Sequence, residues 1–252
     1  MSTFACKMLS NLRKKEIISL KQKKYRQRYR QFVVEGEKSV LELCQSSYSI
    51  QEILLTQTQF DRIGDRLPSA KVLIISNKDS EQLSTLETSP GIMAVSNFKE
   101  STIENVVFKN KFTLMLDSIS DPGNLGTIIR IADWYGIENV ICSPNCVDLY
   151  NPKTIASTMG SFTRINCIYE ELEDVLKNCK VTSYACVMNG ELIQTITKPK
   201  EGIIIIGNEA IGIRSEIEKL ATSKITIPKI GKAESLNAAI ATAIVCYSFV
   251  VK

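Results

Sequence analysis

The chain has 252 residues, of which 44% are hydrophobic and 23% are charged, and its net charge is +4. This length leaves room for one large or two modest domains, and the composition is ordinary for a globular protein. No apolar run approaches the roughly 20 residues that span a bilayer. Because the sequence contains no histidine, mechanisms that use a histidine base, such as Ser-His-Asp and Cys-His, are excluded.

The eight cysteines form no C-x-x-C pair, and there is no histidine to complete a mixed zinc site. We therefore expect reduced thiols and no metal centre. The basic N-terminus is not followed by an apolar core, so it does not have the pattern of a secretory signal. These features predict a cytoplasmic protein that is not attached to a membrane.

Residues 13–30 hold nine Lys or Arg against a single acid, Glu16. Aromatic residues are interleaved with the second half of this basic segment: Tyr25, Tyr29 and Phe32. Such a segment can bind phosphates by charge and stack on unpaired bases, so we expect it to contact RNA. The alternative is a solvated face of a helix, because Ile17, Ile18 and Leu20 form an apolar stripe that would pack on a domain.

From residue 32 to residue 96, short apolar runs alternate with amphipathic ones. The pattern predicts strands at 32–35, 50–56, 72–75 and 91–95, and helices at 39–44, 58–67 and 76–86, the last capped by Ser76. This alternation indicates an α/β domain with parallel or mixed strands. Residues 97–110 are polar and without a strong period, so we expect a linker there, with the domain boundary near residue 100.

The second half begins with a predicted strand at 112–116 and a loop rich in turn formers at 117–124. Asn124 is placed to cap a helix over 125–135 that ends at Gly136. The alternation then continues with strands at 140–142, 165–168 and 183–187, helices at 152–159 and 170–178, and a turn at 161–164.

The last fifty residues organise this half. Gly202–Gly207 is an apolar run between glycines, typical of a buried parallel strand, and a tight turn follows at 208–212. A second strand begins at Ile225 and leads through a loop into an apolar helix that Glu234 or Ser235 can cap. Two loops rich in small residues at the carboxyl ends of parallel strands predict a pocket for a flat organic ligand.

Three segments resemble the motifs of SpoU-like RNA 2′-O-ribose methyltransferases of the SPOUT superfamily: Asn124-Leu-Gly-Thr-Ile-Ile-Arg130, Gly207-Asn-Glu-Ala-Ile-Gly212, and Ile227-Pro followed by Ser235-Leu-Asn237. The resemblance covers about residues 110 to 252. It implies an α/β fold in which a methyltransferase domain at 111–252 is tied in a trefoil knot. It also implies a smaller N-terminal RNA-binding domain at 1–96, similar to ribosomal protein L30e, with a linker at 97–110. Lys24, Arg26 and Arg30 resemble the start of that domain and are its candidate RNA contacts.

The family resemblance implies transfer of a methyl group from S-adenosylmethionine to a ribose 2′-hydroxyl of structured RNA. It assigns the cofactor to loops around Gly207, Gly212, Ile227 and Leu236, and catalysis to Arg130, Asn124, Glu209, Ser235 and Asn237. A guanidinium keeps its proton far above neutral pH. We therefore expect Arg130 to fix a substrate phosphate and to stabilise negative charge on the 2′-oxygen, rather than to act as a free base.

Each of these residues also has a structural alternative. Asn124 and Ser235 can act as helix caps, Arg130 as a surface ion-pair partner, Glu209 as a solvated carboxylate, and the glycines as plain turn residues. Family members are homodimers with the pocket at the subunit contact. The last helix, at 236–251, is apolar on nearly all sides, which fits either a core or a dimer interface.

The additional N-terminal domain favours ribosomal RNA over transfer RNA as the substrate. The alternatives are a tRNA ribose methyltransferase and a non-catalytic RNA-binding protein with the same fold. A dinucleotide-dependent oxidoreductase would also have an α/β pattern, but neither domain has a G-x-G-x-x-G sequence after its first strand.

Overall fold

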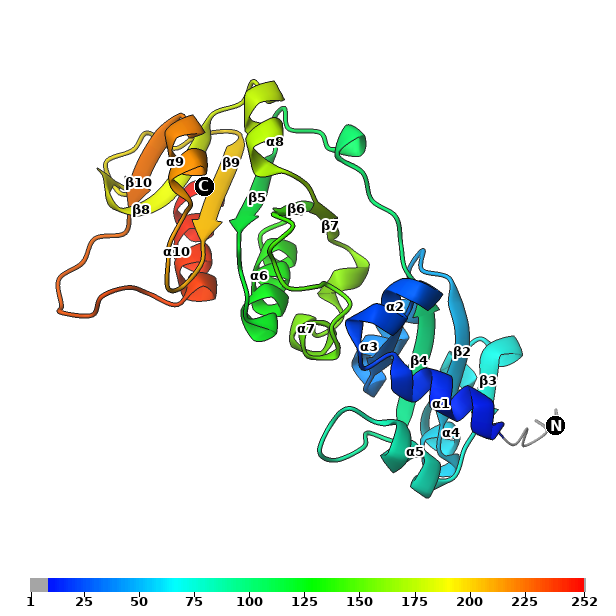
Figure 1. The fold of residues 1–252 in the computed structure, drawn as a ribbon. Coiled ribbons are helices and arrows are strands. Elements are labelled where there is room, and N and C mark those ends of the chain that lie inside the picture. The colour runs from blue at the N-terminus through cyan, green and yellow to red at the C-terminus, as the bar shows by residue number, and fades with distance from the viewer. Residues whose placement is uncertain (1–8, 252) are drawn as a thin grey trace. The chain divides into compact units, whose positions relative to one another are not determined.

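The computed structural model describes residues 9–251, except for the side chain of Ala70, and their contacts divide into two compact units (Figure 1). One unit extends to Glu100 and includes Tyr150–Thr163, whereas the other comprises Ser101–Leu149 and the chain from Arg164 onward. The predicted second domain at 111–252 therefore contains a segment, 150–163, that groups with the first unit.

Aromatic packing explains this grouping. Tyr150 and Phe162 lie against Phe32, with ring centroids 4.4 and 5.9 Å away, and the rings of Phe98 and Tyr150 are stacked at 4.0 Å. Aromatic pairs at these separations add to the free energy gained by burying the rings. Contacts between residues far apart in the chain leave no local pattern in the sequence, so the prediction missed them.

The first unit is built on a four-stranded sheet in the order β1-β4-β2-β3. β2 and β3 are parallel, and β4 runs antiparallel to both β1 and β2. The elements are α1 (Asn11–Ser19), α2 (Lys23–Tyr29), β1 (Gln31–Glu35), α3 (Glu37–Cys44), β2 (Ile50–Leu55), α4 (Gln57–Ile63), β3 (Val72–Ile74), α5 (Asn77–Leu83), β4 (Ile92–Asn97) and α7 (Pro152–Thr158). The predicted α/β arrangement is confirmed, and of the two options, parallel or mixed strands, the sheet is mixed. Ser76 caps α5 as expected.

The second unit contains a six-stranded parallel sheet in the order β10-β8-β9-β5-β6-β7. Its elements are β5 (Phe112–Asp117), α6 (Pro122–Trp134), β6 (Asn139–Cys142), β7 (Asn166–Tyr169), α8 (Leu172–Asn178), β8 (Ser183–Leu192), β9 (Gly202–Gly207), α9 (Ser215–Leu220), β10 (Ser223–Thr226) and α10 (Ala238–Val250). Short 3₁₀ turns occur in both units: Gly64–Arg66, Ser69–Lys71 and Ser161–Thr163 lie in the first, and Ile103–Asn105 lies in the second. The parallel α/β sheet is as expected, although α9 was not predicted.

Helices cover both faces of this sheet, and the strands place apolar side chains on each face. Met115, Ile203 and Ile205 pack in one cluster with side chains of α8 and α9. Successive strand residues point to opposite faces, so Leu116 and Ile204, which are also fully buried, face the other side. That side is covered by α6 and α10, which contact each other (Figure 1). The continuous apolar runs of β5 and β9 are thus explained by burial on both faces.

Two predicted helix caps are wrong. α6 begins at Pro122, and its cap is Asp121, whose Oδ1 accepts a hydrogen bond from the backbone N of Asn124 at 2.8 Å. Proline fits the first turn because it has no N–H to leave unpaired. α10 begins at Ala238, and its cap is Asn237 rather than Glu234 or Ser235.

The seven cysteines in the described part of the chain are free thiols, and Cys6 lies outside it. Burial raises the pKa of Cys186 to about 11 and that of Cys246 to about 12, so both thiols stay protonated near neutral pH. Among residues 9–251, no cluster of three potential metal ligands occurs. Over the same residues, no helix combines the length and apolar character needed to cross a membrane.

Candidate functional site at the carboxyl edge of the second sheet

Three loops leave the same edge of the six-stranded sheet, after β5, β9 and β10. Asp117 at the end of β5 is paired with Gly207 at the end of β9, and the ends of β8 and β10 are paired through Leu192 and Thr226. Carboxyl ends of parallel strands share one edge, so loops far apart in the sequence meet there. Each of the three loops carries or adjoins one of the motifs described above.

A chain of side-chain hydrogen bonds joins the three motifs. Asn237 Nδ2 donates to Asn124 Oδ1 at 2.9 Å, and Asn124 Nδ2 donates to Glu209 Oε1. The bonded residues are 113 and 85 positions apart in the sequence. We call these three residues the motif network. The structure therefore brings together three of the five residues that were predicted to be catalytic.

The amide orientations within the motif network follow from its other bonds. Asn237 Oδ1 accepts from the backbone N of Ala239 at 2.9 Å and of Ile240 at 3.3 Å, which leaves its Nδ2 as the donor to Asn124. The amide oxygen of Asn124 accepts that bond, so its Nδ2 is directed to the carboxylate of Glu209. An ionised carboxylate only accepts hydrogen bonds, so Glu209 is a suitable acceptor for the Nδ2 group of Asn124.

The loop after β9 is held tightly at its base. Asn208 and Gly212 exchange two backbone hydrogen bonds, of 3.0 and 2.9 Å. A Cβ atom at Gly207 would lie 2.3 Å from the carbonyl carbon of Gly212, and Gly212 itself has φ +71°. Both positions therefore require glycine, one for space and one for its backbone conformation. The predicted role of these glycines in turn formation applies whether or not a ligand binds.

Asn208 is a structural residue that sequence reasoning missed. Its Nδ2 donates to the carbonyl of Ser118 at 2.7 Å, which ties the loop after β9 to the loop after β5. Its Oδ1 accepts from the backbone N of Ala210 at 2.8 Å and of Ile211 at 3.2 Å. An asparagine directly after a strand commonly bonds its own turn in this way, which is the signal that could have identified it.

The loop between β10 and α10 is open to solvent. Ile230 and Leu236 are exposed apolar side chains in this loop, and Ile211 is exposed in the loop after β9. Between described residues, no hydrogen bond is donated by a backbone N–H of residues 229–236. Apolar side chains and unpaired backbone donors on two linked loops fit a ligand with a flat ring and a carboxylate, as S-adenosylmethionine has. The predicted cofactor residues Ile227 and Leu236 lie near the two ends of this loop.

Arg130 and Ser235 are not part of the motif network. Arg130 lies on the exposed face of α6 together with Thr127 and Trp134. Its guanidinium has no ion pair with another residue of the described chain, so the alternative of a surface ion-pair partner is not realised there. Glu209 is bonded to Asn124. Ser235 is exposed in the open loop and does not cap α10.

Two known protein families match this chain. The model of the SpoU rRNA Methylase family matches residues 111–247, and that of the MRM3-like substrate binding domain matches residues 11–94. The chain is 31% identical over 242 residues to the 23S rRNA (guanosine(2553)-2′-O)-methyltransferase RlmP of Bacillus subtilis, with 94% of this chain and 95% of that protein covered. The chain belongs to the SpoU rRNA methylase family. The resemblance stated from the motifs is confirmed.

Solved structures of similar proteins match nearly the whole chain. A TrmH-family structure from Porphyromonas gingivalis has a TM-score of 0.87 and 33% identity, and covers 96% of this chain and 98% of its own. The AdoMet-bound rRNA methyltransferase from Sinorhizobium meliloti has a TM-score of 0.86 and 29% identity, and covers 95% of this chain and 94% of its own. The similarity to solved structures thus includes residues of both units of this protein.

Arg26 was predicted to contact RNA from the surface, and this prediction is wrong because the side chain is buried. Its side chain is only 2% exposed, and its Nη1 donates to the carbonyls of Leu20 and Lys21 at 3.0 and 2.9 Å. These carbonyls lie at the end of α1, where the helix leaves acceptors unpaired. Arg26 therefore joins α2 to α1 and does not face solvent.

The other cations of α2 are exposed. Lys24 lies over the ring of Tyr25 at 4.8 Å, and Arg28 over the ring of Tyr29 at 5.6 Å. The two tyrosine rings stack on each other with centroids 6.3 Å apart. Arg30 follows the helix and pairs with Glu100 at 2.9 Å, with both side chains largely exposed. We call Lys23, Lys24, Arg28, Tyr29 and Arg30 the α2 surface. Of these, Lys23, Arg28 and Tyr29 were not among the three residues named as candidate RNA contacts.

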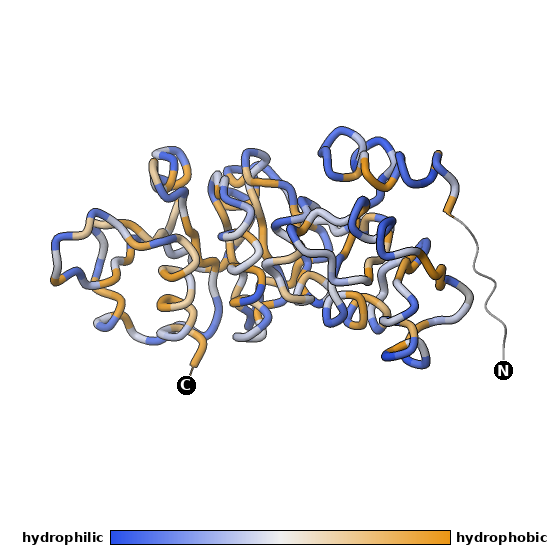
Figure 2. Tube along the Cα trace, turned by 90° about the horizontal axis from the view of Figure 1, so that it is seen from below, coloured by the Kyte–Doolittle hydropathy of each residue, from blue (hydrophilic) through white to orange (hydrophobic). Residues whose placement is uncertain are grey.

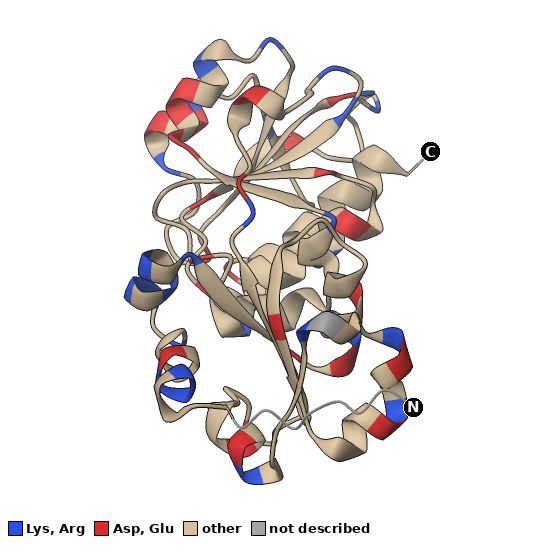
Figure 3. Cartoon of the chain, turned by 90° about the vertical axis from the view of Figure 1, so that its right-hand side faces the viewer, with Lys and Arg blue, Asp and Glu red and all other residues tan. Residues whose placement is uncertain are grey.

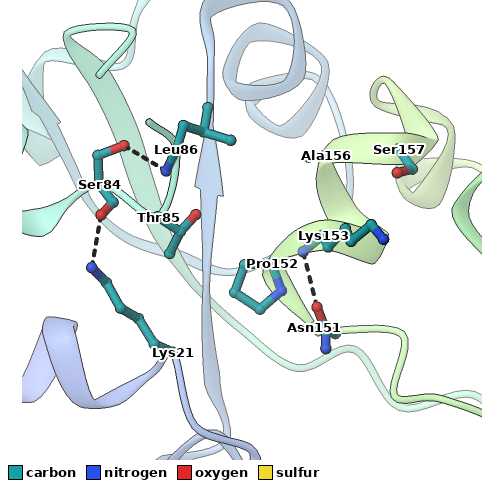
Figure 4. Close-up of a pocket in the computed structure, with 9 residues that line it drawn as sticks. All are labelled: Lys21, Ser84, Thr85, Leu86, Asn151, Pro152, Lys153, Ala156 and Ser157. Carbon is teal, nitrogen blue, oxygen red and sulfur yellow. Dashed lines mark hydrogen bonds between the residues drawn. The ribbon is translucent and has the colours of Figure 1, made fainter. Parts of the chain in front are cut away.

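A cavity of about 690 Å³ lies in the first unit and contains none of the predicted site residues (Figure 4). It is lined by Lys21, Ser84, Thr85, Leu86, Asn151, Pro152, Lys153, Ala156 and Ser157. Lys21 Nζ donates to the carbonyl of Ser84 at 2.7 Å, and the ammonium of Lys153 is directed away from Lys21 (Figure 4). The two cations of this cavity, Lys21 and Lys153, therefore do not converge on one point. The cavity is not a candidate for the methyl-transfer site.

Proposed function

We propose that this protein transfers a methyl group from S-adenosylmethionine to a ribose 2′-hydroxyl of ribosomal RNA. The observation that carries the proposal is the motif network, which joins Asn124, Glu209 and Asn237 where three loops meet at the carboxyl edge of the sheet. Membership of the SpoU rRNA methylase family supports the reaction, and the AdoMet-bound relative supports the cofactor. The match to an rRNA methyltransferase over 94% of the chain favours ribosomal RNA over transfer RNA.

In this proposal the two loops around Gly207, Gly212, Ile227 and Leu236 hold the cofactor through backbone groups and apolar side chains. Bound S-adenosylmethionine supplies a methyl group activated by its positively charged sulfur. The glycines let the backbone approach a ligand closely. The motif network keeps the two loops at a fixed separation, because Asn237 ends one loop and Glu209 lies in the other. Ser235, exposed in the second loop, is free to contact the ligand or the RNA.

Arg130 has a separate part. Its exposed guanidinium can bind a phosphate of the RNA and stabilise the negative charge that develops on the 2′-oxygen. Because a guanidinium retains its proton, Arg130 acts by charge and hydrogen bonding rather than as a base. This role agrees with the position of Arg130 outside the motif network.

We also propose a homodimer that forms through α6 and α10. Trp134 is 82% exposed on α6, and Ile240 and Tyr247 are 54% and 63% exposed on α10. α10 carries no charged residue, and in Figure 3 the helix that leads to the C-terminus is tan throughout. Figure 2 shows the same helix in pale and orange colours. Exposed apolar side chains on two helices that pack against each other favour burial against a second copy.

The finer features of the fold and location are further parts of the proposal. We propose that residues 1–96 form an L30e-like RNA-binding domain and that 97–110 link it to the methyltransferase domain at 111–252, whose residues 150–163 belong to the first compact unit. We propose a trefoil knot in the last segment and a cytoplasmic location for the protein. In the RNA-binding domain, Lys24 and Arg30 contact the RNA together with the rest of the α2 surface, which offers both cations and stacked tyrosines.

The test is methyl-tritium transfer to ribosomal and transfer RNA by the wild type and by Arg130→Ala. We expect labelled ribosomal RNA with the wild type and a loss of about 100-fold with Arg130→Ala. Calorimetry should give nearly the same affinity for S-adenosylmethionine in both proteins. Labelling of transfer RNA alone would support the tRNA alternative. RNA binding without any label would support a non-catalytic protein.

A further inference from the structure

We infer that Arg214 is a positioning residue for methyl transfer, because its pairing with Asp117 holds the loop after β9 in the shape that the cofactor site requires. This inference rests on the proposed function. Neither residue belongs to the set that the motifs assign to catalysis or cofactor binding.

The pairing is formed at the end of β5. Asp117 is 0% exposed, and its carboxylate accepts two hydrogen bonds from Arg214. The backbone N of Arg214 donates to Oδ2 at 2.8 Å, and Nε donates to Oδ1, also at 2.8 Å. A buried carboxylate costs several kcal/mol of desolvation unless it is paired and hydrogen-bonded. Arg214 supplies both a charge and two donors.

Asp117 is a better partner of Arg214 than its other neighbour, Glu173 on α8. Arg214 Nη1 lies 3.3 Å from Glu173 Oε1. Among the described residues, Arg214 Nη2 and Glu173 Oε2 are buried without a hydrogen-bond partner. Burial lowers the pKa of Arg214, but the hydrogen bond and charge of Asp117, together with the charges of Glu173 and Glu216, outweigh this effect and raise the pKa above its ordinary value. The guanidinium is therefore anchored mainly at Asp117.

The end of β5 fixes the loop after β9 at both of its ends. Ser118 has φ +60°, and its carbonyl accepts from Asn208 Nδ2 at the start of the loop. Asp117 binds Arg214 at the end of the loop. Glu209, the member of the motif network in this loop, lies between these two attachments. Replacing the side chain of Arg214 removes the bond from Nε and the charge at one end of the loop, and it changes no residue of the motif network. The backbone N of residue 214 can still donate to Asp117.

Holding this loop matters because each residue that becomes ordered on binding costs conformational free energy. A loop that is already fixed avoids this cost when the ligand binds. Loss of the Arg214 side chain should therefore weaken cofactor binding about tenfold while the sheet remains folded. A residue with a purely structural role would lower the stability of the fold without changing the affinity of the folded protein.

The experiment compares Arg214→Gln with Arg164→Gln. Arg164 forms a similar pair in the same unit, with its Nε 3.0 Å and its Nη2 2.7 Å from the carboxylate oxygens of Asp133, but it lies outside the three loops. Calorimetry with S-adenosylmethionine should show about tenfold weaker binding for Arg214→Gln and less than a twofold change for Arg164→Gln. Arg214→Lys, which keeps the charge, should lie between the wild type and Arg214→Gln, and it replaces Arg214→Gln if that variant does not fold.

A second measurement does not depend on the cofactor. Amide hydrogen exchange at residues 209–213, without S-adenosylmethionine, should be at least severalfold faster in Arg214→Gln than in the wild type or in Arg164→Gln. Unchanged exchange together with unchanged affinity in a folded Arg214→Gln would overturn the inference. A wild type that binds no S-adenosylmethionine, but whose loop exchanges faster when Arg214 is replaced, would refute the proposed function and leave the control of the loop by Arg214 standing.

Discussion

The α2 surface and the motif network show opposite relations between sequence and space. Asn124, Glu209 and Asn237 are far apart in the chain, yet they form one hydrogen-bonded group. Lys24 and Arg26 are two positions apart, yet one is exposed and the other is buried. Closeness along the chain is therefore a poor guide to a shared role in this protein.

The physical reason lies in the two kinds of element. Parallel strands end at a common edge, so each additional strand brings another loop to the same place. A helix turns by about 100° per residue, so positions i and i+2 point to nearly opposite sides. A charge run on a helix is consequently divided between solvent and core, whereas residues at the ends of parallel strands converge.

The largest effect that tests this comparison is expected for Gly207→Ala. The added Cβ would lie 2.3 Å from the backbone of Gly212, so the backbone at the carboxyl edge of the second sheet has to shift. We expect a loss of about 3 kcal/mol in the free energy of unfolding, measured in urea. In Gly231→Ala, where nothing lies within 4 Å of the new atom, the loss should stay under about 0.5 kcal/mol. Equal losses would mean that the contact between Gly207 and Gly212 does not constrain the fold.

The next effect separates Arg26 from its neighbours on α2. Arg26→Met removes two bonds from a buried guanidinium to the end of α1 and should cost about 2 kcal/mol of stability. Arg28→Met, at an exposed position of the same helix, should leave stability nearly unchanged and weaken RNA binding instead. Thermal unfolding and RNA titration of both variants measure these outcomes. If Arg26→Met is as stable as the wild type but binds RNA more weakly, Arg26 contacts RNA as first predicted.

Asn237→Ala should have a smaller effect on stability and a clear effect on activity. It removes the cap of α10 and the bond to Asn124, so we expect a loss of about 1 kcal/mol and slower methyl transfer. Ser235→Ala is the matched control for stability, because Ser235 does not cap the helix, and it should change stability by less than about 0.5 kcal/mol. If Ser235→Ala costs as much stability as Asn237→Ala, the helix does not begin at Ala238 in solution.

The smallest effect concerns single cations of the α2 surface. Lys24→Ala should weaken RNA binding severalfold and reduce the salt dependence of the binding constant by about one unit of slope, as expected for one lost phosphate contact. Lys78→Ala, which removes an exposed cation of α5, is the control and should change neither quantity. The measurement is RNA affinity at several salt concentrations. The same slope in all three proteins would place the RNA elsewhere.

Much of this protein was determined by its sequence alone. The alternation of apolar runs predicted the strands of both sheets, because burial of one or both faces imposes it. The glycines at 207 and 212 marked a tight turn, and the three motifs identified the family and three residues that now form one network. All these features depend on interactions within a few residues or on patterns shared with relatives.

Only the tertiary structure decided the remaining features. It placed residues 150–163 in the first unit through aromatic packing, buried Arg26 against the end of α1, and paired Asp117 with Arg214, which is 97 positions further along the chain. It also showed that Asp121 caps α6 and Asn237 caps α10, which differ from the predicted caps. Charged and aromatic side chains of this kind are equally compatible with solvent and with a partner. Which of the two they meet depends on what the rest of the chain brings beside them.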